Sequence, residues 1–302
     1  MATGITISST SNLSTGQKIV VAAAKSAFEL ASPSPDLVEN ERIPQGVKQW
    51  DNLVYARLQM AQALTEGVDL AENAQLVANS TSITPSEHGM IVSLSKRLIR
   101  RQGDANVVGV AAKNLATSLR IRQASDVIAI YDTFTKNIAQ ANSPLDITYF
   151  RGGVAYLLTD NARADDQSST YGAAPMPLNS ALHIEQISDI ILDVSDPGTA
   201  AGNRPTGWGE EMLQRWWRGS ARLYGVRLFN DQVILRDTSG DSKGAILNAG
   251  AIKLVMANNA DATEEPDNSA RITEYGIFQE WGEALQIDPH GIEVYSDTAA
   301  TI

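Results

Sequence analysis

The chain has 302 residues, of which 43% are hydrophobic and 20% charged, a composition that predicts a folded protein with a sizeable core. Its net charge of −11 excludes the class of proteins that bind nucleic acid or an anionic membrane through an overall positive charge. It has no cysteine, which excludes disulfides, zinc–thiolate sites and cysteine nucleophiles, and no apolar run approaches the ~18 residues that span a bilayer.

Residues 1–41 predict an N-terminal arm rather than a domain. Ser, Thr and Gly open the segment, and an Ala-rich stretch at 15–30 has helical potential. Pro33 and Pro35 then end any helix, because proline cannot continue the backbone hydrogen bonding. The arm is too short to bury a core of its own.

Residues 43–83 predict a long β-hairpin. Its first half alternates apolar and polar residues with the period of two that is typical of strands, the apolar ones being Val54, Ala56, Leu58 and Met60. Polar residues 65–73 predict the turn, and residues 75–83 predict the returning strand. A two-stranded hairpin with so little apolar surface is marginal alone, so it needs a partner that the adjacent sequence does not supply.

One long helix is predicted over residues 104–139, after a turn at 84–89 and a short apolar strand at 90–95. Apolar residues approximate the helical spacing throughout this range, Asp104 is suited to cap the first turn, and no proline occurs before Pro144. At 1.5 Å per residue the helix would be roughly 50 Å long, which is unusual in a globular enzyme.

The remaining sequence predicts a mixed α/β region and a final unit. Residues 179–194 predict a helix, and residues 220–234 predict strands that turn at Asn230–Asp231. The elements expected in the final unit are a strand running into a helix at 244–256, an acidic, proline-containing loop at 258–268, and strands at 271–278, 284–288 and 291–296.

No catalytic, metal or cofactor site is predicted. The histidines His88, His183 and His290 lie outside any metal-ligand spacing. The stretch 240–244 lacks the glycine spacing of a phosphate-binding loop, and adjacent acidic residues point apart on a regular element. The pair Trp216–Trp217 stands among arginines and fits an interface or core edge better than nucleic-acid stacking, because its surroundings are acidic.

Charge is segregated along the chain. Residues 97–140 contain seven basic and three acidic residues, whereas residues 237–302 contain three and twelve. Five arginines define the basic segment: Arg97, Arg100, Arg101, Arg120 and Arg122. The two regions are either solvated faces or surfaces that attract each other between copies of the chain.

The order of these parts resembles that of the major capsid proteins of tailed bacteriophages, which share the Hong Kong 97 (HK97-like) capsid fold. The residues that carry the resemblance are Leu64–Leu70, Ile83–Ser95, the helix after Asp104, Gly244–Leu247, Ala270–Gly276 and the ending Gly291–Asp297. The resemblance implies an α+β fold with an N-terminal arm, an extended hairpin loop, a peripheral domain with a long spine helix, and an axial domain.

The resemblance also implies a division of the chain and a set of contacts. The implied units are an arm at 1–41, an extended hairpin across a neighbouring subunit at 42–90, a peripheral domain at 91–144, an axial domain at 145–240 and a return to the peripheral domain at 241–302. The implied contact residues are Thr65, Glu66, Asp69 and Glu72 at the hairpin tip, and Glu264, Glu265, Asp267 and Arg271 near threefold axes.

Two departures from the family pattern are informative. Some members form a lysine–asparagine cross-link from the hairpin, but no lysine lies between Lys48 and Lys96, so we expect no such cross-link. Some members begin with a scaffold domain that is later cleaved. Here the hairpin begins within about 40 residues of Met1, so we expect a separate scaffolding protein.

The resemblance therefore implies a structural protein and not an enzyme. It would assemble as hexamers and pentamers into an icosahedral shell around double-stranded phage DNA, in the cytoplasm of a host bacterium. The expected partners are other copies, a scaffolding protein, a portal and decoration proteins, with DNA held by confinement and no membrane or cofactor. Two alternatives stay open: a bacterial nanocompartment shell (an encapsulin) with the same fold, and an α/β enzyme of unrecognised type.

Overall fold

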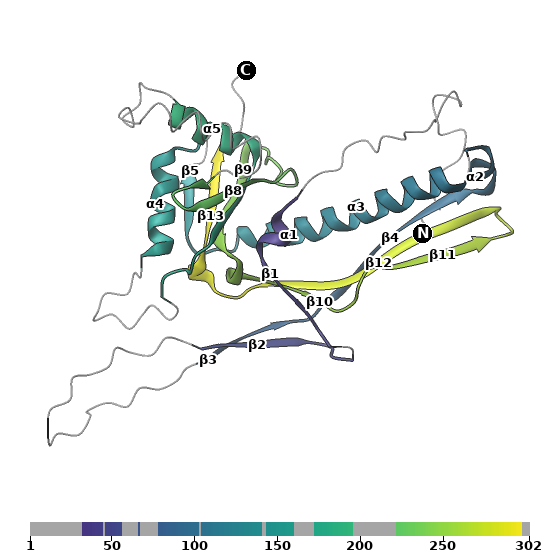
Figure 1. The fold of residues 1–302 in the computed structure, drawn as a ribbon, viewed down its shortest axis with the longest axis horizontal. Helices are drawn as coiled ribbons and strands as arrows, with labels where there is room; N and C mark the ends of the chain where they lie inside the picture. The colour runs from purple at the N-terminus through teal and green to yellow at the C-terminus, as the bar shows by residue number, and fades with distance from the viewer. Residues whose placement is uncertain are drawn as a thin grey trace.

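The computed structural model describes residues 32–44, 46–55, 66, 78–102, 104–140, 143–159, 172–195 and 222–297. These ranges form two main sheets, a separate two-stranded hairpin and a long helix that runs along the first sheet (Figure 1). The α+β class expected from the sequence is confirmed. None of the helices in these ranges is both long and apolar enough to cross a membrane.

The first sheet is built around β12 (Ile272–Leu285), a strand of 14 residues. Along one edge β12 pairs antiparallel with β4 (Ser86–Ser95), and along the other edge with β11 (Asp261–Asp267) and then β10 (Ile252–Met256). β1 (Glu39–Arg42) adds to β10 in parallel. The end of the N-terminal arm is thereby part of the first sheet.

Helix α3 (Asp104–Tyr131) is the long helix, and its 28 residues span roughly 42 Å. It follows α2 (Lys96–Gln102), and it lies along β4 and β12 (Figure 1). Its second half packs against the first sheet, where Val127 and Tyr131 are fully buried in one core with Trp281. The predicted long helix is therefore present.

The predicted C-terminal end of this helix, at residue 139, is wrong. The helix ends at Tyr131, and residues 137–140 form a strand, β5 (Asn137–Gln140). Phe134 and Ile138 continue the helical spacing of apolar residues, but both are buried outside the helix. Gly291 leaves room for the Phe134 ring. Phe134 and Ile138 therefore fit the helical spacing of apolar residues but are buried in the core from the segment that follows the helix.

The second sheet has six strands in the order β5-β13-β9-β6-β8-β7. Besides β5, its strands are β6 (Leu178–Leu182), β7 (Arg222–Leu223), β8 (Val226–Asn230), β9 (Asp241–Asn248) and β13 (Gly291–Asp297). Helices α4 (Ile147–Leu158) and α5 (Ile184–Ser195) pack on this sheet over a buried core that includes Phe150, Ile187 and Ile246.

Residues 241–302 contribute to both sheets. Strands β9 and β13 belong to the second sheet, whereas β10, β11 and β12 belong to the first. Three short elements connect the larger ones: α1 (Ser34–Leu37), η2 (Ala249–Ala251) and η3 (Asp288–His290). The two sheets therefore do not separate along the chain at residue 240.

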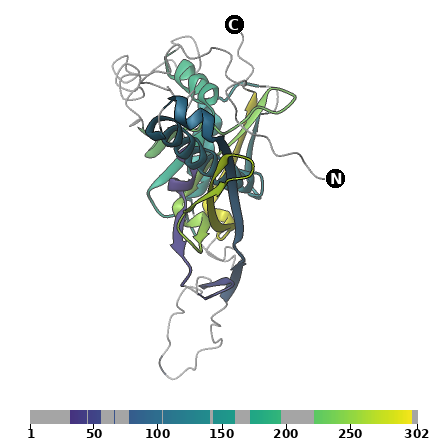
Figure 2. The same ribbon diagram turned by 90° about the vertical axis from the view of Figure 1, so that its right-hand side faces the viewer.

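The hairpin consists of β2 (Trp50–Tyr55) and β3 (Ala78–Ile83), which pair antiparallel with each other and form a sheet of their own. In both views these strands lie at the periphery, below the two main sheets (Figures 1 and 2). The two strands predicted to form a hairpin are thus confirmed where the structure describes them. Residues 56–65 and 67–77 lie outside the described residues.

Several sequence-based boundaries are wrong because pairing overrides local preference. The acidic stretch predicted as a loop is strand β11, because pairing with β12 holds it extended. This edge strand can include Pro266, because the outer edge of a sheet needs no hydrogen-bond donor. The helix predicted within 244–256 is absent, because the buried apolar run 252–256 is strand β10, and periodicity does not distinguish the two. The strands predicted at 271–278 and 284–288 are one, β12.

Three further boundaries shift by a few residues. The predicted turn at 84–89 is confined to 84–85, and β4 begins at Ser86. The predicted helix at 179–194 begins only at Ile184, because the preceding residues form the fully buried strand β6. The turn expected at Asn230–Asp231 follows one residue later, at 232–233 after β8 ends, and a further turn at Tyr224–Gly225, where both residues have positive φ, separates β7 from β8.

Candidate intersubunit surfaces

One face of the β2–β3 hairpin carries large apolar side chains in water. Leu53 and Tyr55 are 57% and 56% exposed, and residues two apart on a strand lie on the same face. Their cross-strand neighbours, Ser80 and Ala78, are small. This exposed apolar face fits contact with a partner better than contact with solvent.

The base of the hairpin is fixed to the first sheet. Trp50 and Ile83 are buried in a cluster with Ile43 and Val255. At Gly282 of β12 an added Cβ would lie 2.7 Å from the Ile83 Cγ2 atom, so glycine allows the hairpin to approach this closely. The hairpin therefore leaves the body in a defined direction while its apolar face stays exposed.

A buried lysine joins the arm, the first sheet and the hairpin. The Lys253 side chain is 4% exposed, and its Nζ lies 2.7 Å from Glu39 Oε1 and 2.6 Å from Glu41 Oε2. The same ammonium lies 5.0 Å from the centre of the Trp50 ring. Burial lowers the pKa of Lys253, but the hydrogen bonds with Glu39 and Glu41 raise it more, so it lies above 10.5.

A buried carboxylate holds the start of the described arm. Asp231, which is fully buried after β8, accepts hydrogen bonds from Ser32 Oγ at 2.7 Å, from the Ser34 backbone N–H at 3.3 Å and from the Ser34 hydroxyl. Two residues later, Asp36 Oδ2 lies 2.6 Å from Arg120 Nη2 on α3. Residues 32–42 are thus attached to both sheets and to the long helix.

The residues predicted near threefold contacts lie together on the β11–β12 hairpin. Glu264, Glu265 and Asp267 belong to β11, every residue of which is exposed. Arg271 lies in the following turn with a φ of 55°. The Ser269 hydroxyl and the Ser269 and Ala270 amides donate to Asp267, and these bonds lower the pKa of its carboxyl. The turn is internally braced, and β11 presents an acidic edge.

The structure divides the basic segment into two parts. Arg97, Arg100 and Arg101 are exposed on α2, and no described carboxylate lies within ion-pair distance of them. Arg120 and Arg122 lie about 24 to 27 Å from the start of α3 at its rise per residue. Both are engaged within the chain, Arg120 with Asp36 as above and Arg122 Nε with Asp126 Oδ1 at 3.0 Å. Of the five arginines that define the basic segment, only the three on α2 have no described carboxylate at ion-pair distance.

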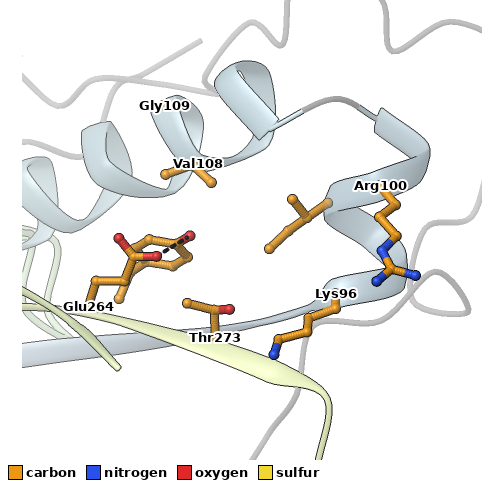
Figure 3. Close-up of a pocket in the computed structure, with 8 residues that line it drawn as sticks. Lys96, Arg100, Val108, Gly109, Glu264 and Thr273 are labelled. Atoms are coloured by element: carbon orange, nitrogen blue, oxygen red, sulfur yellow. Dashed lines mark hydrogen bonds between the residues drawn. The ribbon is translucent and has the colours of Figure 1, made fainter. Parts of the chain in front are cut away.

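A hollow of about 640 Å³ lies between α2, the first turns of α3 and the β11–β12 hairpin (Figure 3). Lys96 and Arg100 stand at one end of it, Glu264 at the other, with Val108 above and Thr273 below. The remaining lining residues are Ile99, Gly109 and Tyr275. The Tyr275 hydroxyl donates to Glu264 Oε1 at 3.3 Å, and Lys96 Nζ donates to Asn268 Oδ1 at 2.5 Å.

Of the predicted hairpin-tip residues, only Glu66 belongs to the part of the chain that the structure describes. Thr65, Asp69 and Glu72 lie outside the described residues, whereas Glu66 is exposed in a turn. The pair Trp216–Trp217 also lies outside them. The contacts expected at these positions stay predictions.

Sequence reasoning missed the residues that attach the arm. A lysine inside the apolar run 251–256 was an available signal for Lys253, because a buried lysine requires anionic partners. No comparable signal distinguishes Asp231 from the other aspartates. Among the described residues, no group of three or more His, Asp or Glu side chains is placed to hold a metal ion.

Comparison with known proteins shows similarity in fold only. No protein-family model matches the sequence, and no curated protein sequence matches it. The head structure of Helicobacter pylori bacteriophage KHP40 superposes with a TM-score of 0.71 at 12% identity, covering 99% of this chain and 100% of that one. The capsid of an empty GTA particle gives 0.63 at 13% identity, covering 95% and 96%. The capsid of cyanophage P-SCSP1u gives 0.64 at 13% identity, covering 94% of each chain.

The chain therefore has the fold of proteins that build virus-like shells. More specifically, its fold is the HK97-like phage capsid fold that the order of sequence elements predicted. The likeness covers nearly the whole chain.

Proposed function

We propose that this protein is the major capsid protein of a tailed bacteriophage, a structural subunit that assembles as hexamers and pentamers into an icosahedral head around double-stranded DNA. The observation that carries the proposal is the β2–β3 hairpin, which is fixed at its base and exposes Leu53 and Tyr55 on one face. Such a face is explained if its partner is a second copy. The shared fold with phage heads supports the same conclusion.

The parts of the chain then take specific roles. The arm at 1–41 reaches along adjacent subunits, the hairpin at 42–90 lies across a neighbour, and α3 is the spine helix of a peripheral domain. The axial domain, assigned to 145–240 from the sequence, also includes β9 and β13, because these strands share the second sheet. The acidic β11 strand contacts neighbours near threefold axes.

The proposal also defines the partners. Other copies of the chain are the main partner, and a separate scaffolding protein, a portal and decoration proteins complete the head in the host cytoplasm. DNA is held by confinement, because a chain with a net charge of −11 does not bind phosphates strongly. No enzymatic activity is part of the role.

Expression of the full chain, alone and with candidate scaffolding proteins, tests this function. Gel filtration followed by negative-stain imaging should show closed shells of uniform size. Shells that enclose protein cargo but never DNA in infected cells would favour a nanocompartment instead. A monodisperse monomer that turns over a substrate and forms no shells would overturn the proposal.

A further inference from the structure

Helix α5 is fixed to the second sheet through its first turn (Figure 1). Gln186 in this turn is fully buried. Its Nε2 donates to Ser242 O at 3.0 Å, to Val294 O at 3.3 Å and to Ser296 Oγ at 3.0 Å. The start of the helix is therefore bonded to β9 and β13, the two strands that η2 and η3 join to β10 and β12 of the first sheet.

His183 caps this turn. Its ring nitrogen Nδ1 accepts a hydrogen bond from the Glu185 N–H at 3.3 Å, and its own backbone N–H donates to Gln186 Oε1 at 3.0 Å. The Ile187 N–H donates to His183 O at 3.3 Å. These bonds form a capping box in which an imidazole replaces the usual hydroxyl. His183 thereby satisfies an N–H group that no carbonyl within the helix can reach.

An imidazole can accept the bond from Glu185 only while it is neutral. In the neutral ring Nδ1 has a lone pair when the proton is on Nε2, whereas both nitrogens of the imidazolium are donors. Histidine ordinarily titrates near pH 6.5. A serine or asparagine at this position would keep the bond at every pH, so the identity of the capping residue introduces a dependence on protons.

The surroundings also disfavour the charged ring. His183 is partly buried, and Arg236, between β8 and β9, brings a positive charge to it and forms an ion pair with Glu185. Burial first, and Arg236 second, lower the pKa of His183 below 6.5, and the positive end of the helix dipole acts in the same direction. Two carboxylates of the same segment, Asp231 and Asp237, are bonded to the arm and to β13 instead.

We propose that His183 makes the attachment of α5 to the second sheet dependent on pH. The neutral imidazole caps the helix and stabilises the folded form above pH 6.5. This contribution is lost as the pH falls below 6.5 and the ring is protonated, because the Glu185 bond breaks and a positive charge is placed beside Arg236. The first turn then loosens, and Gln186 is the contact through which β9 and β13 respond. The inference concerns the folded subunit and does not depend on the proposed function.

NMR of the histidine-labelled subunit tests the protonation directly. The chain has three histidines, so the His183 signals are assigned by their loss in His183→Asn. Near neutral pH the nitrogen signals should place the proton on Nε2, and the titration midpoint should lie below 6.5. Arg236→Gln should move the midpoint to higher pH, because it removes a positive neighbour. A proton on Nδ1, or a midpoint at or above 6.5, would overturn the inference.

Hydrogen exchange of the full chain tests the consequence for the helix. Protection of residues 185–188, corrected for intrinsic exchange rates, should fall by about fivefold between one pH unit above and one below the His183 midpoint, as expected for the loss of an N-cap. His183→Asn, a cap that does not titrate, should keep this protection at both pH values. His183→Ala should lack it at both.

His88→Asn is the matched control, because it removes a histidine of β4 that does not contact α5, and it should respond to pH like the unsubstituted protein. A fall in protection that His183→Asn shares, or equal protection in His183→Ala and His183→Asn, would contradict the proposal. The proposed function would survive either outcome, because shell formation is measured separately.

Discussion

The Lys253 site permits a quantitative test of how the arm is held. Substituting Glu39→Gln together with Glu41→Gln leaves a buried ammonium without its carboxylates. Removing one side of a fully buried ion pair costs about 3–5 kcal/mol. Here the two glutamate side chains are 49% and 46% exposed, so water screens part of the interaction, and we expect a loss of about 2 kcal/mol in the free energy of unfolding.

The variant Lys253→Met should be milder, at less than about 1 kcal/mol. It removes the buried charge, keeps an unbranched chain beside Trp50, and leaves two half-exposed glutamates that water can solvate. Urea unfolding of the unassembled subunit measures both variants, and hydrogen exchange of residues 39–42 reports whether β1 leaves β10. A larger loss in Lys253→Met than in the double glutamine variant would refute this reasoning.

The same site sets a pH dependence. The hydrogen bond from Lys253 lowers the pKa of Glu41, so the contribution of Glu41 is present above pH 4.5 and is lost as the pH falls through its lowered pKa. The raised pKa of Lys253 has the opposite sign: its contribution is present below pH 10.5 and is lost as the pH rises through the raised value. Protection of the β1 amides from hydrogen exchange should therefore fall at both low and high pH. In the double glutamine variant the fall at low pH should be absent.

Two further predictions separate the stability of the subunit from its assembly. Gly291→Ala should destabilise the subunit by about 3 kcal/mol in urea unfolding, because its Cβ would overlap the Phe134 ring, whereas Gly152→Ala should be neutral or stabilising by up to about 1 kcal/mol in an open helical position. Equal effects of the two would show that the Phe134 contact is not tight. Leu53→Ser with Tyr55→Ser should leave urea unfolding nearly unchanged, because both side chains are exposed, but should reduce the yield of shells in negative-stain images. Unchanged yield would remove this face from the interface.

The sequence predicted the elements whose signals are local. The alternation around Val54 and the polar turn after it indicated the hairpin, and the apolar spacing after Asp104 indicated the long helix. The final strand, β13, was also found. In each case the pattern and the tertiary environment favour the same conformation.

The failures occur where a distant strand decides the conformation. Residues 261–267 have the composition of a loop, yet pairing with β12 makes them a strand. The buried run 252–256 is compatible with helix or strand, and its pairing with β1 and β12 settles the choice. For the candidate surfaces, charge indicated α2 and β11, whose contacts with other copies stay predictions, whereas the ion pairs of Arg120 and Arg122 within the chain depend on the fold and have no signal in the sequence.

The parallel pairing of β1 with β10 has a consequence for the order of events during synthesis. Glu39 and Lys253 are 214 positions apart, so the ribosome must make most of the chain before the strand that receives β1 exists. Contacts between such distant residues form late in folding, because a long loop must close first. The base of the hairpin also packs on Val255, so its direction is set only after Val255 has been made. Under the proposed function, a nascent subunit in which β10 has not yet been made therefore lacks the geometry needed to join a growing shell.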